Sequence, residues 1–189
     1  MIQHLKKILN KNKQINFSII MPTYNRAFCI ENAINSLINQ TYQNFELIII
    51  DDGSTDNTKE LLEEKYKEYF DSKKFTYIYK KNEGVCKARN LGLKLANNNW
   101  IGYLDTDNEM LPTFLEEFKN AIETNKKVKC FYAQICYIES GKIIGEPFNF
   151  IQLCYRNYID LGVFVHHKSL VKRYGNFDVN LKRLVDWDL

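Results

Sequence analysis

The stretch Trp100-Ile-Gly-Tyr-Leu-Asp105-Thr-Asp107-Asn108 is an apolar run that ends in two carboxylates spaced by one residue. Its apolar part predicts a buried strand, in which side chains two residues apart lie on the same face. If this geometry continues to the end of the run, Asp105 and Asp107 point the same way, and their oxygens suit a hard cation such as Mg²⁺ or Mn²⁺. A polar turn that caps a core strand is the alternative, because Asp and Asn are common turn residues.

The composition is typical of one globular domain. The chain has 189 residues, of which 45% are hydrophobic and 26% charged, and its formal net charge is only +3. Such a small charge gives no reason to expect a nucleic-acid partner. The sequence contains neither an apolar run of roughly 18 residues nor a signal-peptide core, so we expect a cytoplasmic protein. The cysteines form no CxxC pair, which predicts reduced, buried thiols at Cys29, Cys86, Cys130, Cys136 and Cys154.

Residues 1–16 form a basic and polar leader in which a few apolar residues recur at helical spacing. We interpret them as a solvated leader helix. The alternative is peripheral contact with the anionic inner face of the cytoplasmic membrane, to which each lysine would contribute only about 1 kcal/mol. Nothing in the sequence indicates an oligomeric state.

Strand and helix patterns alternate along the first part of the chain. Compact apolar runs predict strands at residues 17–21, 45–50, 75–79 and 100–104. Apolar residues at three- and four-residue spacing predict helices between them, at residues 28–38, 56–70 and 84–97. This order, with nearly continuous apolar strands, predicts an α/β fold with a Rossmann-like, mainly parallel central sheet flanked by helices.

The pattern changes in the second half of the chain. Pro112 is well placed in the first turn of a helix that reaches about Thr124. Beyond this helix, residues 128–138 are strand-like, Ser140-Gly141 predicts a hairpin turn, and further apolar stretches occupy residues 143–145 and 161–165. We expect a smaller antiparallel or mixed sheet here, followed by a short helix near residues 169–174.

Three of the predicted strands end in unusual polar groups, at residues 22–26, 51–56 and 105–107. Open α/β sheets bind ligands beyond the carboxyl ends of their strands, so a shared pocket explains all three. The sequence has neither a Gly-x-Gly-x-x-Gly fingerprint nor a P-loop to cradle phosphates. A metal held by the Asp pair could neutralise a diphosphate instead.

Five motifs follow one another in the chain: Ser18-Ile-Ile-Met-Pro-Thr-Tyr-Asn-Arg26, Asp51-Asp-Gly-Ser-Thr-Asp56, Asn82-Glu-Gly-Val-Cys-Lys-Ala-Arg-Asn90, Asp105-Thr-Asp107 and Asp186-Trp-Asp-Leu189. In this order and spacing the chain resembles family 2 glycosyltransferases of the GT-A fold. The resemblance covers residues 17–189 and implies a single domain. Residues from about 17 to 108 would bind the nucleotide, and residues from about 109 to 189 would form the acceptor side.

The resemblance also implies roles for individual residues. Asp51 matches the acid that reads the base, and Asp52 stands beside it in the nucleotide-sugar set. Arg89 matches a residue near the ribose or diphosphate, and Asp105 matches the acid on the ribose side. The segment expected to lie along the base, together with the loop that follows it, comprises Pro22, Thr23, Tyr24, Asn25 and Arg26.

Asp107 matches the acid that ligates a divalent metal, Mn²⁺ or Mg²⁺, and Asp186 matches the general base of inverting members. The implied reaction is metal-dependent transfer of a sugar, with inversion, from a nucleoside-diphosphate sugar to an acceptor hydroxyl. A UDP-sugar is the expected donor, and the expected acceptor is a glycan or lipid-linked glycan of bacterial surface polysaccharide or lipooligosaccharide. Several roles have an ordinary alternative: a surface ion pair for Arg89 and simple packing for Tyr24. For Asp51 or Asp52, and for Asp186, the alternative is an acid at the start of a helix.

The chain departs from the family pattern at Asn108 and Val185, where members often carry acids. It also stops at Leu189, which we interpret as a catalytic core cut short or an unusually small member. The Gln-x-x-Arg-Trp motif of processive synthases is absent, which favours a non-processive enzyme.

A non-catalytic GT-A-like binding module and a sugar nucleotidyltransferase remain as alternatives to a glycosyltransferase. Of His166 and His167, at most one could enter the pocket, because neighbouring strand residues face opposite sides.

Overall fold

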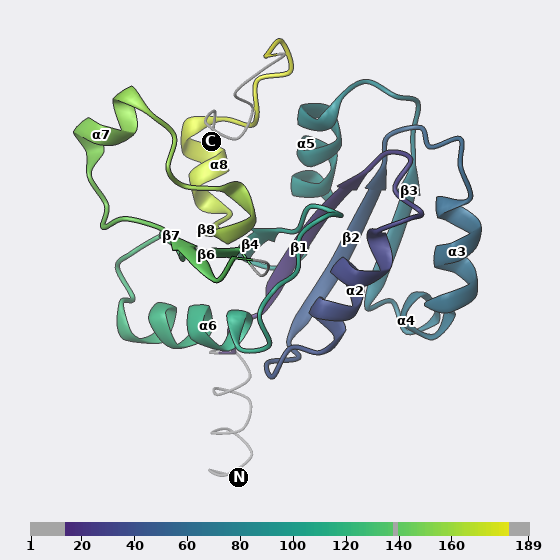
Figure 1. Ribbon diagram of the computed structural model, residues 1–189, viewed down its shortest axis with the longest axis horizontal. Helices are drawn as coiled ribbons and strands as arrows, with labels where there is room; N and C mark the ends of the chain where they lie inside the picture. The colour runs from purple at the N-terminus through teal and green to yellow at the C-terminus, as the bar shows by residue number, and fades with distance from the viewer. Residues whose placement is uncertain (1–13, 138–139, 182–189) are drawn as a thin grey trace, which may run out of the picture.

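The computed structural model describes residues 14–137 and 140–181. Its central sheet contains six strands in the order β3-β2-β1-β4-β8-β5 (Figure 1). The bounds of these strands, in chain order, are β1 (Phe17–Thr23), β2 (Phe45–Asp51), β3 (Phe75–Tyr79), β4 (Trp100–Tyr103), β5 (Cys130–Tyr132) and β8 (Phe164–His167). A separate hairpin consists of β6 (Ile135–Tyr137) and β7 (Lys142–Ile144), which pair antiparallel.

The first four strands are parallel to one another. β1 pairs in parallel with β2 on one side and with β4 on the other, and β3 extends the sheet beyond β2. β8 is antiparallel to β4 and to β5. This arrangement confirms the expected α/β fold with a mainly parallel central sheet and a smaller antiparallel portion in the second half.

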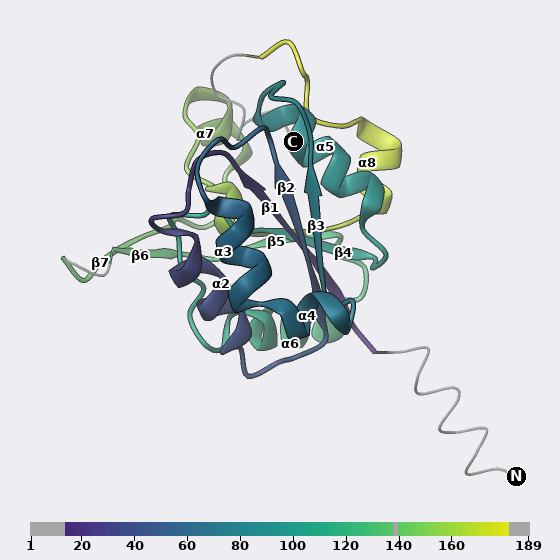
Figure 2. The same ribbon diagram turned by 90° about the vertical axis from the view of Figure 1, so that its right-hand side faces the viewer.

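Helices cover both faces of the sheet (Figures 1 and 2). One face packs against helices α2 (Ile30–Ile38), α3 (Thr58–Lys65) and α6 (Phe114–Thr124), and the opposite face packs against α5 (Val85–Leu95). Three short helices and a 3-10 turn complete the described elements: α4 (Lys67–Asp71), α7 (Phe150–Tyr155), α8 (Ser169–Tyr174) and η1 (Leu161–Val163).

Alternation along the buried strands divides the core into two clusters. In β1, Phe17, Ile19 and Met21 belong to the cluster beneath α2 and α6, whereas Ile20 belongs to the cluster beneath α5. α5 lies close to β1 because Gly92 faces Ile20: a β-carbon at Gly92 would lie 2.5 Å from Ile20 Cγ2. Successive residues of a strand thus anchor helices on opposite faces.

Several details differ from the expectation. In the stretch expected to be strand-like, β5 and β6 are two short strands that belong to different sheets, and residue 138 lies outside the described residues. α7 occupies a stretch for which no helix was expected. Only one of the five cysteines is buried: Cys86 is buried and Cys29 partly so, whereas Cys130, Cys136 and Cys154 are exposed.

The leader expected at residues 1–16 lies outside the described residues over 1–13. Within residues 14–137 and 140–181, none of the helices has the length and apolar character needed to cross a membrane.

Candidate functional site

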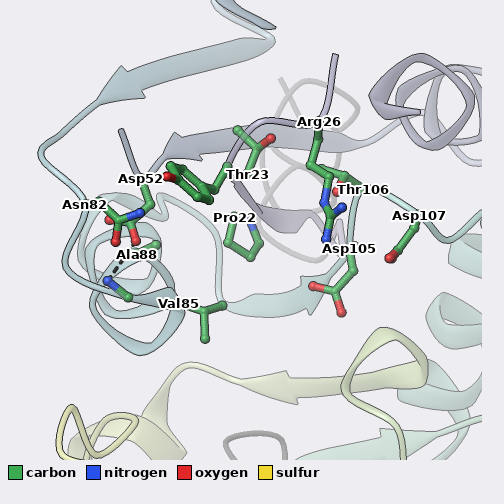
Figure 3. A pocket seen from close by; sticks show the side chains of 12 residues that line it. Pro22, Thr23, Arg26, Asp52, Asn82, Val85, Ala88, Asp105, Thr106 and Asp107 are labelled. Atoms are coloured by element: carbon green, nitrogen blue, oxygen red, sulfur yellow. Dashed lines mark hydrogen bonds between the residues drawn. The ribbon is translucent and has the colours of Figure 1, made fainter. Parts of the chain in front are cut away.

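A cavity of about 420 Å³ opens where β1, β2 and β4 end (Figure 3). Pro22 and Thr23 lie in its middle, Asp52 and Asn82 on one side, and Asp105 and Asp107 on the other. Its lining comprises Pro22, Thr23, Tyr24, Arg26, Asp52, Asn82, Gly84, Val85, Ala88, Asp105, Thr106 and Asp107. Polar residues from three strand ends therefore meet in one cavity.

The topology of the sheet explains this position. The chain passes from β1 outward to β2 and β3, and then returns to place β4 on the other side of β1. The strand order thus reverses between β1 and β4, and the loops that follow these strands diverge. A crevice at such a switch point is the usual ligand site of an open α/β sheet.

Asn25 ties the loop after β1 to the loop after β2. Its backbone has a φ of 53°, a left-handed conformation that Asn tolerates better than most residues. Its side-chain oxygen accepts hydrogen bonds from the backbone amides of Thr55 at 2.7 Å and Asp56 at 3.3 Å. The backbone N–H of Asn25 also donates a hydrogen bond to the Ser54 hydroxyl at 2.8 Å. Asn25 does not line the cavity itself. Its bonds to the loop after β2 fix the position of its sequence neighbours Tyr24 and Arg26, which do line the cavity.

Asp51 and Asp52 face different surroundings. Asp51, the last residue of β2, is fully buried, and its carboxylate accepts hydrogen bonds from the Ser54 amide at 2.7 Å and the Tyr77 hydroxyl at 2.6 Å. Burial and the bond to Asp51 raise the pKa of Tyr77. Asp52 lines the cavity, and Asp51 does not. The expectation that Asp51 reads a bound base therefore has no support in its contacts, which are those of a structural acid.

The Asp52 carboxylate is held by the loop that leads into α5. It accepts hydrogen bonds from the backbone amides of Glu83 at 3.0 Å and Gly84 at 2.7 Å, and it pairs with the Lys80 ammonium at 2.6 Å. Burial lowers the pKa of Lys80, but the hydrogen bonds to Asp52 and Glu83 outweigh it, so the pKa is raised. Gly84 takes a φ of 96°, which favours glycine. Asp52 is thus fixed in orientation at one end of the cavity.

Asp105 and Asp107 lie in a turn rather than in the strand. β4 ends at Tyr103, and the Asn108 amide donates to the Asp105 carbonyl at 3.1 Å to close the turn. Both carboxylates nevertheless line the cavity, Asp105 half-buried and Asp107 exposed. The strand geometry therefore does not continue to the two acids. They lie in a turn, as the alternative had it, and this turn still brings both carboxylates to the cavity.

Arg89 lies behind Asp105 rather than in the cavity lining. The residue is 3% exposed, and one terminal nitrogen of its guanidinium donates to an Asp105 carboxylate oxygen at 3.3 Å. The guanidinium carbon also lies 5.5 Å from the centre of the Phe177 ring. Arg89 is placed to orient Asp105, and the surface ion pair considered as its alternative does not describe a buried guanidinium.

Thr23 and Tyr24 line the cavity with a hydroxyl group and an aromatic ring that a ligand could contact. The Thr23 hydroxyl is buried and has no hydrogen-bond partner among the described residues. Buried hydroxyls are normally paired, so an unpaired one in a cavity wall is available to a ligand. The Tyr24 ring is 47% exposed and free to stack against a flat group.

The donor set fits a hard divalent cation. Among the described residues no group of three or more His, Cys, Asp or Glu side chains is arranged to hold a metal on its own. Two carboxylates beside an open cavity suit Mg²⁺ or Mn²⁺, because such ions commonly keep waters or phosphate oxygens as their remaining ligands. Asp105 and Asp107 provide those carboxylates.

The structure thus brings most of the expected site residues together and reveals others. Asn82, Gly84, Val85 and Ala88 line the cavity from a motif already noticed in the sequence, but no role was expected for them. Thr106 joins them from the turn. Asp186, the expected base, lies outside the described residues. The remaining candidates, His166 and His167, do not line the cavity.

Residues 18–175 match the sequence profile of the family described as Glycosyl transferase family 2. An uncharacterised glycosyltransferase of Rickettsia conorii is 39% identical over 160 residues, which are 79% of this chain and 25% of that protein. Chondroitin synthase of Escherichia coli is 29% identical over 178 residues, which are 91% of this chain and 25% of the synthase. The minor teichoic acid biosynthesis protein GgaB of Bacillus subtilis is 37% identical over 122 residues, 60% of this chain and 13% of that protein. The chain spans about a quarter or less of the length of these relatives.

Two solved structures have a similar fold. The S. aureus TarS fragment 1-349 in complex with UDP superposes with a TM-score of 0.73 at 23% identity, over 92% of this chain and 53% of that fragment. The mannosyltransferase PcManGT of Pyrobaculum calidifontis, in complex with GDP-Man and Mn²⁺, gives a TM-score of 0.69 at 19% identity, over 91% of this chain and 50% of that enzyme. At these identities the likeness concerns the fold alone.

Proposed function

Because the chain belongs to glycosyl transferase family 2 and has the GT-A fold, we propose that it transfers a sugar, with inversion, from a UDP-sugar to an acceptor hydroxyl. The observation that carries the proposal is the cavity with Asp52 at one end and Asp105 and Asp107 at the other. A nucleoside-diphosphate sugar has a hydrogen-bonding base at one end and a charged diphosphate at the other. The cavity offers partners of the matching kind at both ends.

The base would bind beside Asp52. The imide N–H of uracil is a donor, and the Asp52 carboxylate is an acceptor that Lys80 and two backbone amides already hold in place. Asp52 thereby takes the role expected for Asp51. The Thr23 hydroxyl, which lacks a partner among the described residues, would bond to the nucleoside, and the Tyr24 ring would stack on the base.

The ribose and diphosphate would lie toward Asp105 and Asp107. Asp105, oriented by Arg89, would accept a hydrogen bond from a ribose hydroxyl. Asp107 would hold a divalent cation, which supplies positive charge to stabilise the departing diphosphate. Arg26, which lines the same side of the cavity, adds a fixed positive charge near the phosphates.

Asp186 is proposed as the general base on the strength of its sequence motif, since it lies outside the described residues. It would accept the proton of the acceptor hydroxyl as the hydroxyl oxygen attacks the anomeric carbon and the bond to the diphosphate breaks. We place the nucleotide part at about residues 17–108 and the acceptor side at about 109–189. Relatives named for chondroitin and teichoic acid synthesis support a bacterial surface glycan as acceptor, and a cytoplasmic enzyme would have access to the donor.

The test is a panel of nucleotides and nucleotide sugars in the presence of Mn²⁺. We expect UDP to raise the melting temperature more than GDP, ADP or CDP does, and we expect release of UDP from one UDP-sugar when acceptor extract is added. Binding of UDP without its release under any of these conditions would point to a binding module. Stabilisation by nucleoside triphosphates alone would point to a nucleotidyltransferase.

The Asp186→Asn variant separates binding from chemistry. A variant that lacks only the general base should bind UDP as the wild type does and lose transfer by roughly a hundredfold or more, the usual size of a general-base effect. Normal transfer by this variant would show that Asp186 is not the base.

A further inference from the structure

The segment that contains Phe177 is fastened to α5 by one side chain. The Asn90 amide nitrogen donates to the Phe177 carbonyl at 2.8 Å, and the Phe177 backbone N–H donates to the Asn90 amide oxygen at 3.0 Å. These two bonds join positions separated by 87 residues in the sequence. Because an amide side chain used as donor and acceptor at once fixes both the position and the direction of a backbone, the segment has one docked orientation.

The Phe177 ring lies in the core and contacts both Tyr103 and Arg89. It is 2% exposed and meets the Tyr103 ring edge-on, with 5.7 Å between the ring centres. On another side it contacts Arg89, whose guanidinium carbon lies 5.5 Å from the ring centre. A guanidinium buried against an aromatic ring is attracted to it and restricted in its rotation.

The same guanidinium reaches the cavity through Asp105. Its terminal nitrogen donates to the Asp105 carboxylate at 3.3 Å, longer than the roughly 2.7–3.2 Å usual for an N–H···O bond. A bond of this length is easily lost when the donor shifts, because its strength falls steeply with distance and angle. The contacts therefore form a chain from Asn90 through Phe177 and Arg89 to Asp105.

We propose that Phe177, held by Asn90, is a positioning residue for the donor site. Its ring fixes the position of the Arg89 guanidinium, and the guanidinium in turn orients the Asp105 carboxylate toward the nucleotide. This inference rests on the proposed function, in which Asp105 contacts the donor. It assigns donor affinity to a segment 72 positions further along the chain than Asp105 and outside the cavity lining. Neither the spacing of the motifs nor the cavity itself indicates that dependence.

The first experiment measures the dissociation constant of UDP by calorimetry in the presence of Mn²⁺. We expect Phe177→Leu, which keeps an apolar side chain but removes the ring face, to weaken UDP binding roughly three- to tenfold, the range of a desolvated cation–π contact. Phe164→Leu is the matched control, because Phe164 packs against the same core cluster and stacks on His166. The control should change the UDP dissociation constant by less than about twofold. Asn90→Ala should weaken UDP binding in the same direction as Phe177→Leu, and it replaces that variant if the latter does not fold.

A double-mutant cycle distinguishes positioning from a general loss of stability. In an Asp105→Asn background the carboxylate that Phe177 is proposed to orient is gone, so Phe177→Leu should then change the UDP dissociation constant by less than about twofold. The inference is overturned if Phe177→Leu weakens UDP binding equally in both backgrounds, or if it has no effect in the wild-type background. Failure of the wild-type protein to bind UDP at all would instead overturn the proposed function on which the inference rests.

Discussion

We predict that His166 makes the fold sensitive to acid. Its ring is 1% exposed and lies between the rings of Tyr103 and Phe164, with centre distances of 5.8 and 5.6 Å. Nδ1 lies 3.4 Å from the His167 carbonyl, an acceptor, so Nδ1 carries the proton and Nε2 accepts from the Tyr103 hydroxyl at 2.9 Å. Burial lowers the pKa of His166 from its ordinary 6.5 to about 4. The folded protein therefore holds this imidazole neutral.

The sign and size of the effect follow from linkage. A group whose pKa is lower in the folded state contributes stability above its unfolded pKa and loses it as the pH falls through the folded pKa. The difference between 6.5 and about 4 corresponds to roughly 3 kcal/mol, lost between pH 7 and pH 4. This is a large part of the 5–15 kcal/mol typical of a folded domain.

The assay is urea unfolding of the wild type and His166→Gln at several values between pH 7 and pH 4. Between these limits the free energy of unfolding of the wild type should fall by roughly 3 kcal/mol more than that of the variant. His167→Gln is the matched control, since His167 is the neighbouring residue on β8 but only partly buried, and it should retain most of the pH dependence. Parallel curves for the wild type and His166→Gln would refute the reasoning.

Two further predictions concern stability. Gly92→Ala should lower the free energy of unfolding by about 1–3 kcal/mol, because the new methyl group would lie 2.5 Å from Ile20 Cγ2; a urea midpoint at or above that of the wild type would contradict this. Tyr77→Phe should lower it by about 1.5–3 kcal/mol, because the buried Asp51 carboxylate loses its 2.6 Å bond. Tyr79→Phe, an exposed residue of the same strand, should stay within about 0.5 kcal/mol, and equal losses in both Tyr variants would show that the bond contributes nothing.

The parallel half of the fold could be predicted from sequence because its signals are local. Each of its strands is a compact apolar run, and each run is followed by a helix with apolar residues at helical spacing. Polar residues at the strand ends also located the cavity, since parallel strands bring their carboxyl ends to one edge. These patterns need no knowledge of distant contacts.

The choice between Asp51 and Asp52 could not be made from sequence. The two acids are adjacent, and the end of a strand turns neighbouring side chains in different directions. Their environments are decided by partners far along the chain: Tyr77 bonds to Asp51, and Lys80 bonds to Asp52. Arg89 is similar, because its guanidinium packs against the ring of Phe177, a residue far along the chain.

The second half was predicted less well because its elements are short and depend on distant partners. β5 has three residues and belongs to the central sheet only by pairing with β8, which pairs in turn with β4. The apolar side chains of α7 are largely exposed, so the periodicity expected for a buried helix face was missing. Cys130, Cys136 and Cys154 lie in these short elements and are exposed, so the expectation that they are buried was wrong.

The most direct test of the proposed function is the linkage between UDP and Mn²⁺ at Asp107. The dissociation constant of UDP should be measured by calorimetry with Mn²⁺ and with chelator, for the wild type, Asp107→Ala and Glu109→Gln. Glu109 is an exposed acid two residues further on that does not line the cavity. The account predicts that Mn²⁺ tightens UDP binding at least tenfold in the wild type and in Glu109→Gln, and not in Asp107→Ala. The same tightening in Asp107→Ala, or no binding of UDP by the wild type, would contradict it.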